Sequence, residues 1–406
     1  MSTAVPSTTA PDKESMKTDH SRAVAEGAHS HAGPAPAGQR FTSFELSDFP
    51  VPTGREEEWR FSPVDRFQKF FSGELAGPAP TVAVEAADGV TSEQVGREDE
   101  RLGRIGEPVD RVAAAAWNAF TEATVLTVSA KQTPAEPTSV TITGAGGDEP
   151  GTQHLLVVAE EQSEATVVVN HTGSAQLAQT VEIDVRDGAQ LTLVTLQEWD
   201  EGSVHLSAHR ARVGRNAKLR HIVVTLGGDV VRITPDAVLA EPGGEVEGLG
   251  LYFTDEGQHQ EHRLLVDHVA PNCISRVTYK GALQGQDAHA VWIGDVVIRS
   301  EAEGTDTYEL NRNLVLTEGA RADSVPNLEI ETGEIEGAGH ASATGRFDDE
   351  QMFYLRARGI PELEARRLVV IGFFAELINQ IAVPSVTDRL TQAIEEEIRH
   401  TEAVSA

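Results

Sequence analysis

The chain has 406 residues, enough for two or three structural units with a sizeable core, and a formal net charge of −31. This acidic balance argues against nucleic acid or an anionic membrane surface as a partner, because phosphate groups bind to clustered Lys and Arg. The single cysteine, Cys273, excludes an internal disulfide and any zinc or iron–sulfur site built from this chain's thiolates alone.

The sequence predicts neither a signal peptide nor a membrane span. Residues 1–40 lack an apolar core, and the longest apolar run, Leu368 to Phe374, has seven residues, whereas a span needs about 20. The use of a single cysteine is typical of a reducing compartment. We therefore expect a cytoplasmic protein that does not enter a membrane.

The first 123 residues contain two predicted parts. Residues 1–40 are rich in Ala, Pro, Ser, Thr and Gly, which predicts a disordered tail. Its H-x-H pair, His29 and His31, lacks the further ligands that a metal site needs. Residues 41–123 contain an aromatic-rich segment and a helix expected from Pro108 onward, so we predict an N-terminal, mostly helical domain.

Residues 124–346 are predicted to form short strands, such as LLVV, TVVVN, VEIDV and LTLVTL. The turn residues Gly188, Gly214, Gly243 and Asn272 follow one another at intervals of 26, 29 and 29 residues. Repeats of this length that contain strands alone favour a β-helix, in which each coil covers its neighbour. A β-sandwich is the alternative, because it also has short, evenly spaced strands.

The C-terminal segment 347–406 is predicted to be a helical domain. Asp348 and Gln351 have the spacing of a capping box, Gly359 is typical of a helix end, and Pro361 of the next first turn. Beyond Pro384, apolar residues recur every four positions. We interpret this stripe as a core face, with a docking face as the alternative.

Sequence motifs for nucleotide hydrolysis, zinc proteolysis, serine hydrolysis and dinucleotide binding are not found. His259 and His262 would point to opposite faces of a strand, so they are not expected to form a ligand pair. His205 and His209 would share one face, which we interpret as a solvated sheet face. Cys273 is expected to be a small buried hydrophobe, with a reactive thiol as the alternative.

His340 lies at the end of the predicted strands, among Gly337, Ala338, Gly339 and Ala341. Small neighbours leave its imidazole accessible to a partner surface. A neutral imidazole can ligate iron and can replace cysteine on an iron–sulfur cluster. His340 is therefore a candidate metal or cluster ligand, with a purely structural histidine as the alternative.

The stretch HASATGRFDDEQMFYLRARGI (340–360) closely resembles the carboxy-terminal motif of the SufB/SufD family, the scaffold proteins of SUF iron–sulfur cluster assembly. The segments EEEWRFSPV, AWNAF and HVAPNCISRVTYKGAL resemble further family motifs, so the resemblance covers residues 55–400. It implies a right-handed parallel β-helix flanked by N-terminal and C-terminal helical domains. It also implies a non-catalytic scaffold subunit without a nucleotide site of its own.

The resemblance implies two protein partners. A SufB-like paralogue would pair through the β-helix, and a nascent iron–sulfur cluster would form transiently between the two chains at His340. A SufC-like ABC-type ATPase would dock on the C-terminal helices, around Phe353, Tyr354, Leu355, Arg358, Ile371 and Phe374. Whether a flavin takes part is left open.

The resemblance is strongest to SufD, because SufB-like chains are usually longer and carry functional cysteines, whereas this chain has only Cys273. Ala338 stands where the family often has cysteine, so a thiol at that position cannot contribute. Two other functions stay possible at this point: a β-helix enzyme acting on acidic polysaccharide, and a plain interaction module.

Overall fold

The computed structural model describes residues 40–347 and 349–405. The predicted disordered tail, but for its last residue, and the predicted helix cap Asp348 lie outside this range. The described residues are mainly β-structure and form a β-solenoid of about eight coils. The predicted β-helix is therefore confirmed.

The strands of the solenoid form two sheets of nine strands each in the described part of the chain. The first sheet, sheet A, contains β1 (Thr81–Glu85), β4 (Thr138–Thr143), β6 (Glu164–Gly173), β8 (Gln190–Trp199), β10 (Lys218–Thr225), β12 (Glu245–Thr254), β14 (Ile274–Leu283), β16 (Thr305–Val315) and β18 (Ile335–Arg346). The second, sheet B, contains β2 (Val90–Gly96), β3 (Glu122–Val128), β5 (Gly151–Ala159), β7 (Gln176–Val185), β9 (Val204–Val213), β11 (Val230–Leu239), β13 (His259–His268), β15 (His289–Ile298) and β17 (Arg321–Ile330).

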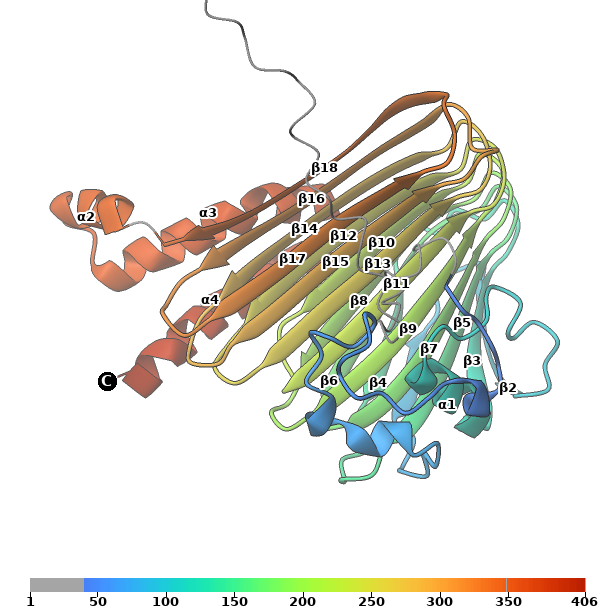
Figure 1. Ribbon diagram of the computed structural model, residues 1–406, viewed down its shortest axis with the longest axis horizontal. Helices are drawn as coiled ribbons and strands as arrows, with labels where there is room; N and C mark the ends of the chain where they lie inside the picture. Colours follow the sequence, from blue (N-terminus) through green and yellow to red (C-terminus); the bar gives the residue numbers. More distant parts are fainter. Residues whose placement is uncertain (1–39, 348, 406) are drawn as a thin grey trace, which may run out of the picture. The chain divides into compact units, whose positions relative to one another are not determined.

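Successive strands of the chain alternate between the two sheets, and from β3 onward neighbours in each sheet run parallel (Figure 1). A β-sandwich is built from antiparallel strands, so this pairing excludes the alternative fold. Side chains that hydrogen-bond between adjacent coils lie about one repeat apart, such as Gln153 and Gln179 (26 residues) and Ser275 and Thr307 (32 residues). The turn spacing in the sequence corresponds to one coil.

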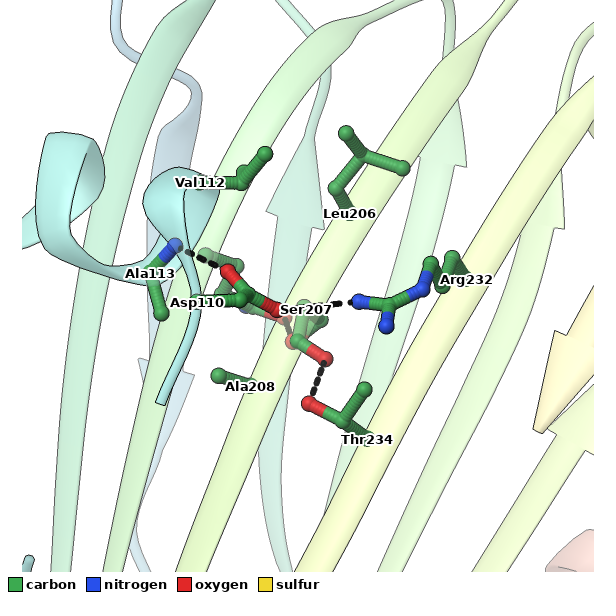
Figure 2. A pocket seen from close by; sticks show the side chains of 9 residues that line it. Asp110, Val112, Ala113, Leu206, Ser207, Ala208, Arg232 and Thr234 are labelled. Atoms are coloured by element: carbon green, nitrogen blue, oxygen red, sulfur yellow. Dashed lines mark hydrogen bonds and ion pairs between the residues drawn. The ribbon is translucent and has the colours of Figure 1, made fainter. Parts of the chain in front are cut away.

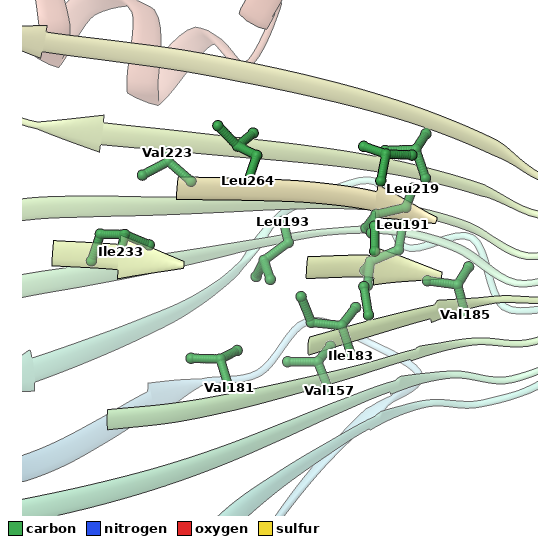
Figure 3. Close-up of a cluster of buried hydrophobic side chains, with 14 of the residues drawn as sticks. Val157, Val181, Ile183, Val185, Leu191, Leu193, Leu219, Val223, Ile233 and Leu264 are labelled. Carbon is green, nitrogen blue, oxygen red and sulfur yellow. The ribbon is translucent and has the colours of Figure 1, made fainter. Parts of the chain in front are cut away.

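The space between the sheets is filled by the inward-facing side chains of every coil. Strands buried on both faces are rich in Val, Ile and Leu, as expected for a parallel sheet. Figure 3 shows part of this core, in which residues of both sheets pack together, among them Val157, Val181, Ile183, Val185, Leu191, Leu193, Leu219, Val223, Ile233 and Leu264.

Buried polar side chains also lie in the space between the two sheets. Gln179 accepts hydrogen bonds from His205 Nε2 (3.1 Å) and Ser207, and its amide nitrogen lies 3.0 Å from His171 Nε2. His209 Nδ1 lies 3.0 Å from His221 Nε2. The interpretation of His205 and His209 as residues of a solvated face is therefore wrong: both are buried, because the face that they share points into the solenoid.

The N-terminal segment differs from the mostly helical domain that we expected. It contains one α-helix, α1 (Arg111–Ala119), three short 3-10 helices, and the strands β1 and β2. These two strands pair antiparallel with β4 and β3, whose outer edges would otherwise be unpaired. The 3-10 helices are η2 (Leu46–Asp48), η3 (Val64–Arg66) and η4 (Gln68–Phe71).

A buried guanidinium, that of Arg232 on β11, holds the N-terminal segment against the outer face of sheet B. It pairs with Glu58 (2.7 Å), Asp110 (3.0 Å) and Glu261 (3.2 Å) and lies over the ring of Trp59. Figure 2 shows Asp110 between Arg232 and the first turn of α1, where its carboxylate accepts from the backbone nitrogen of Ala113. The cavity beside them, of about 10 Å³, has room for one water molecule.

Three helices follow the last strand: α2 (Asp349–Ala357), α3 (Glu362–Ile381) and α4 (Pro384–Ser405). The last two pack on the outer face of sheet A. Arg220 donates to the carbonyl of Gln380 and Lys280 to that of Phe373, which ties α3 to strands β10 and β14. The stripe on α4 is buried and confirms the core-face interpretation: Val386, Leu390, Ile394 and Ile398. In the described residues, no helix combines the length and apolar character of a membrane span.

The buried imidazoles should make the fold sensitive to acid. Burial lowers the pKa of His171 and His221 to about 4 and that of His262 to about 3. In the unfolded chain these pKa values return to about 6.5, so between pH 6.5 and 4 protons bind preferentially to the unfolded chain. The free energy of unfolding in urea should therefore be lower at pH 5 than at pH 7.5.

The variant His262→Gln, whose amide can still bond to Thr225, should show a smaller pH difference, since one such site is removed. The exposed His340 provides the matched control: His340→Gln should keep the full difference. Equal free energies of unfolding at the two pH values would contradict the prediction.

Candidate functional site

Within the described residues, the last coil of the solenoid has no neighbouring strand on one side. Its strands β17 and β18 end sheets B and A, and each pairs with one strand only among the described residues. Figure 1 shows them, in orange, at the same end of the two sheets. Their outward edges therefore present unpaired backbone donors and acceptors.

His340 lies in the middle of β18 and is exposed, as expected. In the parallel register its Cα partner is Glu309 on β16. Partners in a parallel sheet project to the same face, and Glu309 points into the solenoid, so His340 lies on the inner face at the open end. Gly339, next to His340, lies close to the ring of Tyr308. A Cβ atom at Gly339 would lie 3.2 Å from that ring.

The carboxyl group of Glu309 is buried and has no hydrogen-bond partner in the part of the chain that the structure describes. The residue is 1% exposed, and neither Oε1 nor Oε2 is paired. Burial and the nearby charge of Asp295 raise its pKa to about 8, so at neutral pH it is largely a neutral acid. Gly294 of sheet B leaves space for the carboxyl group of Glu309, because a Cβ atom at Gly294 would lie only 2.9 Å from Oε2.

Hydrogen-bonded polar side chains surround this end of the interior. Tyr252 Oη donates to Asn313, and Asn311 donates to Tyr252 Oη at 3.0 Å. Ser324 of β17 donates to Asn311 and accepts from Asn313, which joins the two sheets. The interior below His340 is therefore polar.

Sequence reasoning missed Glu309. A signal was present in TDTYELNRNLV (305–315), where polar residues alternate with others along a strand, so that Thr305, Thr307, Glu309, Asn311 and Asn313 share one face. Such a face is usually assigned to solvent. In this structure sheet B covers that face of β16.

The thiol of Cys273 lies in the interior, where its surroundings do not favour the thiolate. The residue is fully buried, and its Sγ donates to the carbonyl oxygen of Glu241 at 3.4 Å. Burial raises the pKa of the thiol, whereas nucleophilic thiols have lowered pKa values. Cys273 also precedes β14 at a position level with the start of β16, several residues before the Glu309–His340 pair.

The predicted docking residues divide into an exposed and a buried group. On α2, Phe353 is 75% and Tyr354 55% exposed, and the Arg358 guanidinium lies 4.5 Å from the centre of the Tyr354 ring. Leu355 is half-buried. In Figure 1, α2 lies beside α3 and away from the strands.

Phe374 is wrongly placed in a docking surface, because α3 turns this residue onto sheet A. It is 0% exposed and packs in the cluster that contains Leu249, Leu251 and Phe253. Ile371 is half-buried against the same cluster. The apolar middle of α3 thus stabilises the fold and leaves α2 as the exposed part of the predicted surface.

A groove of about 1050 Å³ lies between α4 and the turns that connect sheet A to sheet B. Carboxylates predominate in its lining: Glu198, Asp200, Glu201, Asp229, Asp255, Glu256, Glu318 and Glu396. They do not converge on a point, since no group of three or more His, Cys, Asp or Glu in the described residues could hold a metal ion.

The family model for the SUF system FeS cluster assembly SufBD core domain matches residues 141–373. This range includes most of the solenoid, His340 and the first half of α3. A relative, the iron–sulfur cluster assembly SufBD family protein of Mycobacterium tuberculosis, is 56% identical over 373 residues, which cover 90% of this chain and 94% of that protein. The chain belongs to the SufBD family.

The resemblance seen in the sequence is thereby confirmed, and the alternative of a polysaccharide enzyme loses its basis. SufBD family proteins are scaffold components of iron–sulfur cluster assembly. The two branches of the family match this chain almost equally. SufD of Bacillus subtilis is 26% identical over 258 residues (61% of this chain, 57% of SufD), and SufB of the same organism 27% over 231 residues (56% and 49%).

Replacing the unpaired acid should stabilise this SufBD protein. In the unfolded chain Glu309 ionises near pH 4.5, whereas in the fold it ionises near pH 8. Its cost to stability is therefore absent below pH 4.5, grows through neutral pH and is complete above pH 8. At about 1.4 kcal/mol per pKa unit, Glu309→Gln should raise the free energy of unfolding at pH 8 by a few kcal/mol.

Urea unfolding at pH 8 and pH 4.5 measures the effect, which should vanish at the lower pH. Glu336→Gln, at an exposed position of β18, should change the stability little at either pH. A Glu309→Gln protein less stable than the parent at pH 8 would contradict the assignment of Glu309 as a buried, unpaired acid.

Proposed function

We propose that this chain is a SufD-like, non-catalytic scaffold subunit of a cytoplasmic SUF iron–sulfur cluster assembly complex. The observation that carries the proposal is the open last coil, with an exposed histidine on its edge strand in a member of the SufBD family. The presence of only one cysteine, which is buried, favours the SufD branch over SufB.

The edge of β18 is the proposed attachment site for a SufB-like paralogue. The strand has 12 residues, IEGAGHASATGR, without proline and with charges only at Glu336 and Arg346. Soluble proteins usually shield such edges with prolines, lysines or bulges, and β18 has such an irregularity only near its start, at Glu336. A strand of the partner added here would pair the free backbone groups and bury β18.

Pairing along β18 would enclose His340 between two chains. The nascent cluster, which is the cargo of the complex, would then have His340 as one ligand, with thiolate or carboxylate ligands from the partner. Ala338 supplies no thiol, and Cys273 is buried elsewhere. Glu309 lies one strand away and could accept or release a proton as the ligands are loaded.

The exposed aromatic residues of α2 are the proposed contact for a SufC-like ATPase. Phe353 and Tyr354 form an apolar surface that no part of the chain within residues 40–347 and 349–405 covers. Aromatic side chains of this kind commonly dominate the binding energy of interfaces. This chain has no P-loop motif, and a partner ATPase would supply the nucleotide hydrolysis of the complex.

Coexpression with genes for the candidate partners tests the assembly. Purification should yield a complex that contains a SufB-like chain and an ATPase. Phe353→Ala with Tyr354→Ala should release the ATPase, with at least a tenfold loss of affinity, and leave the fold intact. Phe374→Ala, matched in chemistry but buried, should instead lower stability by about 3–5 kcal/mol. A chain that purifies alone would count against the proposal.

The cluster role of His340 has its own test. In the complex, His340→Ala should abolish the visible absorption of an anaerobically reconstituted cluster while the chains still copurify. Ser342→Ala, two residues along the same face of β18, is the control and should keep the cluster. Full cluster absorption in His340→Ala would refute the ligand role, and a complex without any iron would favour a plain interaction module.

A further inference from the structure

Two histidines of adjacent coils meet on the outer face of sheet B. His259 begins β13, His289 begins β15, and the two are partners in the parallel register. Their Nδ1 atoms lie 3.2 Å apart, with the ring planes at 68°. The pair is away from His340, which belongs to sheet A.

Each ring has a carboxylate at its other nitrogen. His259 Nε2 lies 3.3 Å from Glu261 Oε2, and His289 Nε2 lies 2.8 Å from Asp323 Oδ2. Both acids are held in place: Glu261 by Arg232 and Ser62, Asp323 by Arg321. Each carboxylate is paired with a guanidinium, 3.2 Å from Arg232 Nε for Glu261 and 2.8 Å from Arg321 Nε for Asp323, so both act as charged hydrogen-bond acceptors.

This arrangement determines where the ring hydrogens lie. An ionised carboxylate accepts hydrogen bonds only, so each Nε2 must carry a hydrogen and donate it. A neutral imidazole with its hydrogen on Nε2 has a lone pair on Nδ1. Two Nδ1 lone pairs would then lie 3.2 Å apart, and their repulsion is relieved when both nitrogens bind one cation, either a shared proton or a metal ion.

We propose that His259 Nδ1 and His289 Nδ1 bind one divalent transition-metal ion. A tetrahedral ion with metal–nitrogen distances of about 2.0–2.1 Å places two of its nitrogen ligands about 3.3 Å apart, close to the observed separation. Metal-bound histidines usually donate their other N–H to a carboxylate, as Glu261 and Asp323 are placed to accept. Imidazole ligands suit Zn²⁺, Co²⁺, Ni²⁺, Cu²⁺ and Fe²⁺ rather than Mg²⁺ or Ca²⁺.

Water completes the coordination. The described residues offer no third His, Cys, Asp or Glu ligand at this point. The His289 side chain is 23% exposed, whereas that of His259 is 3% exposed, so solvent reaches the ion from the β15 side. The proposal does not depend on the assembly role proposed above.

Titration of the metal-free full-length protein with Co²⁺ and Zn²⁺ tests the site. The expected result is one ion per chain whose binding is weakened at least tenfold by His289→Gln, as followed by Co²⁺ absorption and by Zn²⁺ competition. Asp323→Asn should weaken binding about 10–100-fold, because it removes the acceptor behind His289. Asp306→Asn, which removes an exposed carboxylate from an ion pair of sheet A, is the matched control and should bind as the parent does.

The sequence contains a second pair of imidazoles, His29 and His31. Replacing both by Gln should leave the His289-dependent binding unchanged. Crystals soaked in Zn²⁺ provide a readout without variants, namely an anomalous peak between the two Nδ1 atoms. Absence of that peak, or binding that His289→Gln does not weaken, would overturn the proposal and assign a shared proton to the pair.

Discussion

Hydrogen bonding between successive coils is the interaction on which this structure depends. Each strand of the solenoid is complete only when a neighbour covers both of its edges. At the first coil β1 and β2 provide that cover by antiparallel pairing, while α1 and the 3-10 helices pack on β7, β9 and β11 of sheet B. At the last coil nothing in the described chain does so for β17 and β18. The interaction that builds the core thus also creates the surface at which we propose that a second chain binds.

Coil stacking also brings together residues that are one repeat apart. Glu309 meets the strand of His340, and His259 meets His289, because each pair occupies equivalent positions of adjacent coils. A solenoid can therefore build a site from single residues of successive repeats. The unpaired acid at Glu309 lowers stability at neutral pH, and such a cost is typical of residues retained for function.

Much of the architecture could be predicted from local pattern. Turn residues at nearly constant intervals predicted the coils, and the apolar stripe of α4 predicted its buried face. Three expectations were wrong because each depends on a neighbouring element that the local sequence pattern does not show. The β1 and β2 segments became strands because β4 and β3 needed partners, His205 and His209 point inward, and Phe374 lies against sheet A.

By itself, the sequence determined the repeat length, the change from strands to helices near residue 347, the family motif around His340 and the scarcity of thiols. These are properties of neighbouring residues and of composition, which a linear pattern contains. Only the tertiary structure decided which face of each strand is buried, that Glu309 is left unpaired, and that His259 faces His289. Those outcomes depend on coil register and on the opposite sheet, which bring distant residues together, and a shift of one residue would reverse every face.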